Sequence, residues 1–165
     1  ISANFMPAIE KGIRGVLTDG AVAGFPMEKI FVAITDGKEH PVDSKPIAFE
    51  IAAREAFKLA VANASPVLLE PIMLIDITVP ESNMGDVMSD LNSRRARVQG
   101  MDSISGKSVV TAEVPLAEVQ RYVTDLRSIT QGRGVFSLKY LRHEQVPSHL
   151  AQTVIDVAKS DSKDE

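Results

Sequence analysis

The sequence predicts an α+β protein, in which a helix-rich first half precedes a complete β-α-β-β-α-β series. Three observations predict this organisation. Apolar side chains alternate with polar ones in short β-branched segments of the second half, and they recur at helical spacing between those segments. Pro-containing stretches at Ser65-Pro66 and Glu70-Pro71 separate the two halves, so we set a domain boundary near Pro66.

The first half contains two predicted helices and one predicted strand. A helix over residues 5–19 has a one-sided apolar face, with Asn4 at its start and Gly20 at its end; the face contains Met6, Ile9, Ile13, Val16 and Leu17. The run from Lys29 to Thr35 is apolar on both faces and predicts a strand, followed by an Asp36-Gly37 turn. A second helix over 46–61 begins at Pro46; its inward face contains Phe49, Ala53, Ala56, Phe57 and Ala60.

The second half supplies the remaining elements in order. Strands are predicted over 73–79, 95–101, 108–114 and 135–142, with a hairpin loop over 102–106. One helix follows Pro80, with Met84, Val87, Met88 and Leu91 inward; another follows Pro115, with Leu116, Val119, Val123 and Leu126 inward. A Gly-rich break over 130–134 ends the second helix. Two helices on one face of such an antiparallel sheet make the ferredoxin-like arrangement.

The last segment is predicted as a tail over 148–165. It begins with a weak helix, and its polar end from Lys159 to Glu165 is predicted to be disordered. The domains expected are therefore 1–65, 66–147 and this tail.

Composition excludes several classes of protein. The chain has no Cys, which rules out disulfides, thiolate metal sites and Cys nucleophiles. No apolar run reaches the ~18 residues of a membrane span, so no membrane partner is expected, and the absence of Cys fits a cytoplasmic protein. The net charge of −4 excludes a strongly basic nucleic-acid protein as a description of the whole chain.

Positive charge is nevertheless concentrated locally. Residues 92–107 carry four basic residues against Asp102, and residues 121–142 carry five against Asp125. Clustered guanidinium groups on a mildly acidic chain are typical of a localised phosphate-contacting face. The plainer interpretation is an ordinary solvated surface, and charge alone favours that interpretation.

Several collinear motifs resemble the C-terminal part of the bacterial translation elongation factor G family. Residues 64–73, Met84-Gly85-Asp86-Val87, residues 114–118, residues 124–128 and Thr130-Gln131-Gly132-Arg133-Gly134 resemble its fifth domain. Residues 7–13, Gly24-Phe25-Pro26, Asp36-Gly37 followed by His40, and Val42-Asp43-Ser44 resemble the second half of its fourth domain. The resemblance covers roughly residues 5–147. Arg95-Ala96-Arg97, Lys38-Glu39 and Lys45-Pro46-Ile47 depart from the family pattern and suggest a divergent paralogue.

The resemblance implies a fold and a role for each part. Residues 1–65 would be a partial α/β domain like that of ribosomal protein S5, and residues 66–147 the ferredoxin-like domain. The parent would be a GTPase that drives translocation of tRNA and mRNA, with the ribosome as partner. The loop with Gly37, Lys38 and His40 would then be the tip that enters the decoding site, where an imidazole can bond RNA without a permanent charge.

A second set of residues is expected to contact the large ribosomal subunit, through ribosomal RNA or ribosomal protein. It is expected to form one arginine-bearing corner and contains Arg94, Arg95, Arg97, Arg127, Gln131 and Arg133. The alternative is that these residues only cap helix ends.

No catalytic, cofactor or metal site is expected within this chain. It has no phosphate-binding loop of the GTPase type and no nucleophile elbow, so GTP and Mg²⁺ are expected in a separate G domain of the parent. Asp36, His40 and Asp43 match no common metal-ligand spacing.

Other functions remain open from the sequence. The parent could instead act in ribosome recycling or antibiotic protection, or the chain could be a ferredoxin-like module that binds small molecules. Strands preceding Ile1 are expected in a complete fourth domain, so the strand over 29–35 is expected to expose an edge and to promote self-association or disorder.

Overall fold

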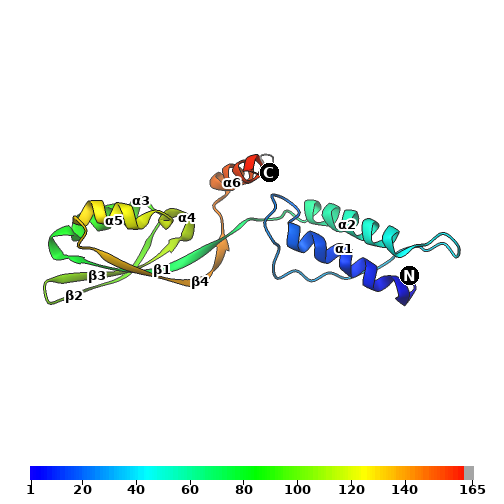
Figure 1. Cartoon of the computed structure of the whole chain (residues 1–165), viewed down its shortest axis with the longest axis horizontal. Helices are drawn as coiled ribbons and strands as arrows, with labels where there is room; N and C mark the ends of the chain where they lie inside the picture. The colour runs from blue at the N-terminus through cyan, green and yellow to red at the C-terminus, as the bar shows by residue number, and fades with distance from the viewer. Residues whose placement is uncertain (162–165) are drawn as a thin grey trace. The chain divides into compact units, whose positions relative to one another are not determined.

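The computed structural model describes residues 1–161 and has the predicted mixed α+β composition. The chain divides into two compact units, Leu68–Val146 and a unit formed by Ile1–Val67 with the segment that begins at Pro147. We call them the sheet unit and the helical unit (Figure 1).

The sheet unit contains one antiparallel four-stranded sheet in the order β2-β3-β1-β4. The strands are β1 (Leu69–Pro80), β2 (Arg97–Ile104), β3 (Lys107–Pro115) and β4 (Val135–Gln145). The helices between them are α3 (Met84–Ser93), which follows a 3₁₀ turn at Glu81–Asn83, and the pair α4 (Leu116–Val119) and α5 (Tyr122–Thr130). This strand order confirms the ferredoxin-like prediction.

The core of the sheet unit lies between the sheet and its helices, which cover one face (Figure 1). Alternate residues of the two central strands meet the inward faces of α3 and α5; the fully buried members include Ile75, Ile77, Val110, Ala112, Leu91 and Leu126. Each such valine, leucine or isoleucine side chain contributes about 1.5–3 kcal/mol when fully buried. The apolar residues that alternate along these strands in the sequence are therefore those whose burial stabilises the sheet unit.

Two local predictions in the sheet unit are wrong. The loop expected over 102–106 is a two-residue turn, because Ser105 and Gly106 both have positive φ, as in a type I′ turn that suits twisted strands. The helix expected from Pro115 is interrupted after Val119 and restarts at Tyr122. The interruption changes the phase of the helix, so Tyr122 is buried and Val123 is exposed.

The helical unit is built on two long helices, α1 (Met6–Asp19) and α2 (Pro46–Asn63), with a 3₁₀ turn at Ala3–Phe5. Their core contains Val16, Phe57 and Val61. The backbones approach closely at Gly12, where an added Cβ would lie 2.3 Å from the carbonyl oxygen of Glu50. Gly20 ends α1 with a φ of 77°, as its position after the helix predicted.

The strand predicted over 29–35 is not present. Residues 30–40 have no ladder partner, and within the described chain no residue from 29 to 39 makes a backbone-to-backbone hydrogen bond. A strand requires a neighbouring strand to satisfy its backbone groups, and the described part of this unit contains none. The expected Asp36-Gly37 turn is likewise replaced by a turn at 41–43.

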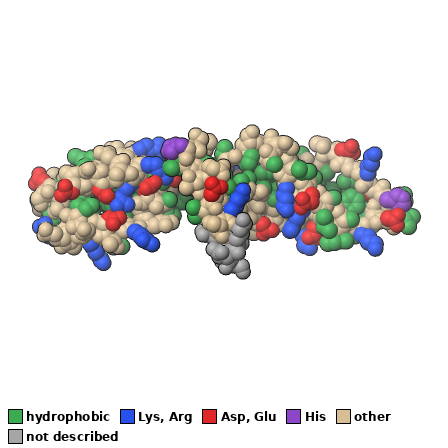
Figure 2. All heavy atoms as spheres, turned by 90° about the horizontal axis from the view of Figure 1, so that it is seen from above, with side chains coloured by type: hydrophobic (Ala, Val, Ile, Leu, Met, Phe, Trp, Pro, Cys, Tyr) green, Lys and Arg blue, Asp and Glu red, His purple; other side chains and the backbone are tan. Residues whose placement is uncertain are grey.

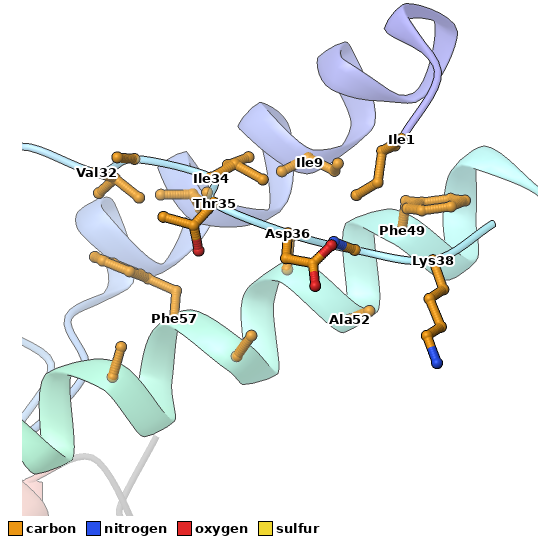
Figure 3. A pocket seen from close by; sticks show the side chains of 16 residues that line it. Ile1, Ile9, Val32, Ile34, Thr35, Asp36, Lys38, Phe49, Ala52 and Phe57 are labelled. Carbon is orange, nitrogen blue, oxygen red and sulfur yellow. The ribbon is translucent and has the colours of Figure 1, made fainter.

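The unpaired segment lies over the two helices and leaves a pocket of about 370 Å³ beneath it. Val32 and Ile34 face this pocket from the segment, Ile9 from α1, and Phe49 and Phe57 from α2 (Figure 3). Phe31 lies before the two inward residues and is 91% exposed. Ala33 and Thr35 also line the pocket, and the segment is exposed along its length, so the burial on both faces that the apolar run indicated is not found.

The segment after Pro147 forms α6 (Ser148–Asp161). The weak helix expected there is present, and it continues through Lys159 into the part predicted to be disordered; residues 162–165 lie outside the described residues. No helix among residues 1–161 is both long enough and apolar enough to span a bilayer.

Candidate functional site

The tip loop, residues 36–44, connects the unpaired segment to α2 and is exposed throughout except at Ser44. The backbone N–H of Gly37 donates to the side chain of Asp36 at 2.7 Å. A Cβ at Gly37 would lie 2.1 Å from the end of the Ile1 side chain, which would have to shift to make room for it.

His40 organises the turn that follows. Its backbone N–H donates to Oγ of Ser44 at 2.7 Å, and its ring Nδ1 accepts from the backbone N–H groups of Val42 at 3.4 Å and Asp43 at 3.3 Å. Ser44 is a residue that the sequence analysis did not select. Its signals in the sequence were its place in the Val42-Asp43-Ser44 motif and its position two residues before Pro46, the start of α2.

The two charged residues before His40 differ in their contacts. Glu39 accepts from the backbone N–H of Ser2 at 2.6 Å and from the Ser2 hydroxyl, and these hydrogen bonds lower the pKa of its carboxyl group. Lys38 makes no ion pair with a described residue, and its ammonium end extends away from the pocket (Figure 3). Lys38 and the ring of His40 therefore remain accessible to a partner.

The arginines expected to form one corner lie at opposite ends of the sheet. Strand register puts Arg97 opposite Glu113, at the end of the sheet where β1 begins and β4 finishes. The segment with Arg127, Gln131 and Arg133 precedes Val135, which pairs with Thr78 at the other end. The predicted single corner is wrong, because α3 and α5 finish at opposite ends of the sheet. On the face in Figure 2, basic side chains are likewise interleaved with acidic ones.

Arg94 is held by three neighbouring elements. Its guanidinium donates to both oxygens of Asp90, to the carbonyl of Glu118 at 2.7 Å and to Asp125 at 2.7 Å. It also lies 5.0 Å from the ring centre of Tyr122. Hydrogen bonds to Asp90, and then to Asp125, raise the pKa of Arg94. The i,i+4 spacing of Asp90 and Arg94 was the signal for this pairing.

Arg95 binds two carboxylates that lie far away in the sequence. It donates to both oxygens of Glu70 at 2.8 and 2.9 Å and to Glu118 at 2.8 Å. Hydrogen bonding to Glu70 raises the pKa of Arg95 despite partial burial. Bidentate pairing of this kind satisfies most of the guanidinium donors.

Arg97 belongs to a four-charge cluster on the sheet face that lies opposite the helices. It donates to Glu144 at 2.6 Å, and Arg142 donates to Glu113 at 2.6 Å and also to Glu144. Bonding to Arg142 lowers the pKa values of Glu113 and Glu144. Arg94, Arg95 and Arg97 are thus engaged with acids of their own unit.

The Gly-rich turn at the other end presents side chains rather than backbone donors. The backbone N–H of Gly132 donates to the carbonyl of Arg127, and that of Arg133 donates to the carbonyl of Thr130. The backbone N–H of Gly134 donates to the Thr130 hydroxyl. Arg133 also bonds the Thr130 carbonyl through its side chain at 3.2 Å. Arg127 makes no ion pair with a described residue, so this turn offers an exposed arginine pair beside Gln131.

Among the residues expected to contact the ribosome, cations that make no ion pair with a described residue thus lie at two places, Lys38 in the tip loop and Arg127 with Arg133 in the Gly-rich turn. The described residues contain no group of three or more His, Asp and Glu suited to a metal ion.

Comparison with known proteins gives two family matches in succession. The family model described as elongation factor G, domain IV, matches residues 1–65, and that described as elongation factor G C-terminus matches residues 67–154. A crystal structure of a protein from Thermus thermophilus is 42% identical to the chain, covers 97% of it and superimposes with a TM-score of 0.81. The chain spans 24% of the length of that protein.

Proposed function

The chain belongs to the elongation factor G family, and from that membership we propose that it is the ribosome-binding part of a translational GTPase. The observation that carries this proposal is the order of the two family domains along residues 1–154. The parent protein would use GTP to move tRNA and mRNA through the ribosome.

We propose a mechanical role for each unit. The tip loop with Gly37, Lys38 and His40 would enter the decoding site beside tRNA and mRNA. An exposed lysine suits a phosphate, and an exposed imidazole suits a base, a phosphate or a ribose hydroxyl. The sheet unit would bind the large subunit and transmit the nucleotide state of the parent.

The exposed turn with Arg127, Gln131 and Arg133 is the better candidate for large-subunit contact. Arg94, Arg95 and Arg97 already bond acids of their own unit, so an RNA phosphate would have to compete with those carboxylates. We therefore propose that those three arginines shape the surface and that Arg127 and Arg133 touch the partner.

GTP hydrolysis would take place in a part of the parent outside this chain. We propose that the chain itself is not an enzyme and needs neither GTP nor Mg²⁺ to bind ribosomes. Adding GTP and Mg²⁺ to the isolated chain should therefore leave its affinity for ribosomes at constant ionic strength unchanged.

Co-sedimentation with ribosomes over a range of salt concentrations tests the proposal. Binding should weaken as salt rises, because phosphate contacts release counterions. The variant Arg127→Gln should lower affinity, whereas Lys139→Gln, which removes the same single charge from β4, should have less effect. Absence of binding at low salt, or equal effects of the two variants, would contradict it.

A further inference from the structure

A carboxylate of the tip loop binds the residue just before the 3₁₀ turn that leads into α1. Both oxygens of the Glu39 side chain accept from Ser2, whose backbone N–H donates to Oε2 at 2.6 Å and whose hydroxyl donates to Oε1. Both donors belong to one residue, 37 positions away in the sequence. A two-point contact fixes the orientation of a carboxylate as well as its position. We call this contact between Glu39 and Ser2 the clasp.

The clasp satisfies a backbone donor at the beginning of a helical segment. Ser2 is followed by the 3₁₀ turn at Ala3–Phe5, and its carbonyl accepts from the Phe5 N–H at 3.1 Å. N–H groups at the start of a helical segment have no acceptor within that segment. The Ser2 side chain makes no capping bond to the turn, because its hydroxyl donates to Glu39 instead. The tip loop therefore supplies an acceptor that the turn itself lacks.

Lys38 lies between two points at which the loop contacts residues 1 and 2. On one side of it, a Cβ at Gly37 would lie 2.1 Å from the end of the Ile1 side chain, so the loop backbone packs closely there. On the other side is the clasp. The ammonium end of Lys38 extends away from the pocket (Figure 3). Contacts on both sides of Lys38 thus fix the direction in which its side chain leaves the loop.

We infer that Glu39 is a positioning residue, which clasps Ser2 to hold the tip loop in place and to leave Lys38 free for an anionic partner. The partner group would be an RNA phosphate. A released Glu39 carboxylate, one residue from the ammonium, would be free to pair with Lys38 and would weaken its attraction for that phosphate. The part of the inference that concerns the partner rests on the proposed ribosome binding; the clasp itself does not.

The clasp is closed at neutral pH. Hydrogen bonds from the hydroxyl and the N–H of Ser2 lower the pKa of Glu39 below 4.5, and the charge of the Ile1 amino group adds a smaller effect of the same sign. A carboxyl group with a lowered pKa favours the clasped state above its ordinary pKa, and that preference is lost as the pH falls through the lower value. Three other titratable side chains bond within the loop: Asp36, His40 and Asp43.

Three variants separate the clasp from the charge of Glu39. Ser2→Pro removes both donors and leaves the charge unchanged, and the φ of −63° at Ser2 already fits proline. Ser2→Ala removes the hydroxyl and keeps the backbone N–H. The double variant Ser2→Pro/Glu39→Gln opens the clasp and also removes the carboxylate that Ser2→Pro alone would set free.

The clasp is tested in the whole chain without ribosomes. By ¹³C NMR, the Glu39 carboxyl group should titrate below 4.5 in the wild type, and its midpoint should move toward 4.5 in Ser2→Pro and by a smaller amount in Ser2→Ala. Amide ¹⁵N relaxation should show lower order parameters at Lys38 and Glu39 in Ser2→Pro than in the wild type. An unchanged midpoint or unchanged order parameters in Ser2→Pro would overturn the clasp.

Ribosome co-sedimentation tests what the clasp does for the partner. Ser2→Pro should bind about threefold more weakly than the wild type, the size expected of one exposed charge interaction, and Ser2→Pro/Glu39→Gln should recover the affinity. Wild-type affinity in Ser2→Pro, or no recovery in the double variant, would show that Glu39 does not keep Lys38 free. If the wild-type chain does not bind ribosomes, the proposed function fails, whereas the NMR results still decide the clasp.

Discussion

Arg94 joins three helices of the sheet unit at a single guanidinium group. It bonds Asp90 on α3, the Glu118 carbonyl on α4 and Asp125 on α5, and its side chain is only 17% exposed. The contacts with Glu118 and Asp125 join residues 24 and 31 positions apart in the sequence, so composition and local charge could not reveal them. Arg94, which belongs to a positive cluster in the sequence, is therefore paired with acids of its own unit in the fold.

Replacing this guanidinium should destabilise the sheet unit. Arg94→Met keeps the apolar stem but leaves Asp90 and Asp125 without their cation, and we expect a loss of about 2 kcal/mol in the free energy of unfolding. Urea unfolding followed by circular dichroism measures it. Arg127→Ala is the matched control and should change stability by less than about 0.5 kcal/mol. Equal losses in the two variants would contradict the network.

Arg95 and Gln131 occupy the same strained position after two different helices. Their φ angles are 57° and 53°, and in each case the next residue bonds back to the helix, Ala96 to Leu91 and Gly132 to Arg127. This is the Schellman arrangement, in which glycine is the preferred residue. Ion pairs of the Arg95 side chain with Glu70 and Glu118 offset the strain of its left-handed backbone. Gln131 makes no side-chain hydrogen bond with a described residue.

Glycine should therefore act differently at the two positions. Gln131→Gly relieves the left-handed backbone and should raise the free energy of unfolding by about 1 kcal/mol. Arg95→Gly gains the same relief but loses three hydrogen bonds to carboxylates, so it should lower stability. Thermal unfolding of both variants measures the effects. Stabilisation by Arg95→Gly would mean that its ion pairs contribute little.

Secondary-structure elements were predictable from sequence wherever their stabilising contacts were periodic. The inward faces of α3 and of the strands around Ile75 and Val110 follow the apolar pattern, because burial is what the pattern records. The predictions at Lys29–Thr35 and Val123 were wrong for non-local reasons: the first lacks a neighbouring strand, and the second follows a helix interruption.

The candidate site was predictable only in part. The exposure of the tip loop agrees with its Gly- and Pro-bounded sequence, but the ring contacts of His40 depend on backbone geometry that no pattern encodes. Whether an arginine is accessible depends equally on acids elsewhere in the chain. Arg95 has such acids in Glu70 and Glu118, and Arg127 has none among the described residues.

The pairing of α1 and α2 depends on a glycine at their closest approach. A methyl group at Gly12 would lie 2.3 Å from a backbone oxygen, which cannot move without displacing α2. Gly12→Ala should therefore destabilise the helical unit by about 1–2 kcal/mol despite alanine's higher helix propensity. Gly85→Ala in α3 is the control, because a Cβ there meets nothing within 4 Å. It should stabilise, as circular dichroism of urea unfolding would show.

On the sheet face that lies opposite the helices, two glutamate carboxyl groups have lowered pKa values. Bonds to Arg142 lower the pKa values of Glu113 and Glu144 below the usual 4.5. A carboxyl group with a lower pKa in the folded state adds stability above its unfolded pKa, and that stability is lost as the pH falls through the folded pKa.

Acid should therefore weaken the contact between β3 and β4 in a way that depends on Arg142. We expect the urea midpoint of the sheet unit to fall as the pH drops below about 4.5, and to fall less in Arg142→Gln, which lacks the cation that lowers both pKa values. Lys139→Gln on the same strand is the control. Parallel pH profiles for the wild type and Arg142→Gln would contradict this.

At the scale of the whole molecule, the chain carries a segment, residues 29–39, whose backbone edge pairs with no described strand. Residues 29–39 make no backbone-to-backbone hydrogen bonds within the described chain, and Phe31 is almost fully exposed. Such an edge is a template for pairing with another chain. A second copy fits it, because antiparallel pairing centred on Ala33 sets Val32 of each copy against Ile34 of the other, so the apolar positions are self-complementary.

We therefore expect the chain to self-associate through this segment when it is studied alone. The sequence contains no Cys, and an Ala33→Cys variant would bring two thiols together at the symmetry axis, because opposed Cα atoms in antiparallel strands lie about 4.5–5.5 Å apart, within disulfide range. Oxidation should yield a covalent dimer, and far less from Val42→Cys, which is also exposed but lies outside the segment. Phe31→Lys, which puts a charge on the edge, should abolish the cross-link in the Ala33→Cys background. A monomer by sedimentation at tens of micromolar, with equal cross-linking at both positions, would show that the edge stays unpaired. The backbone groups of residues 29–39, apart from the Gly37 N–H that Asp36 accepts, must then be satisfied by water.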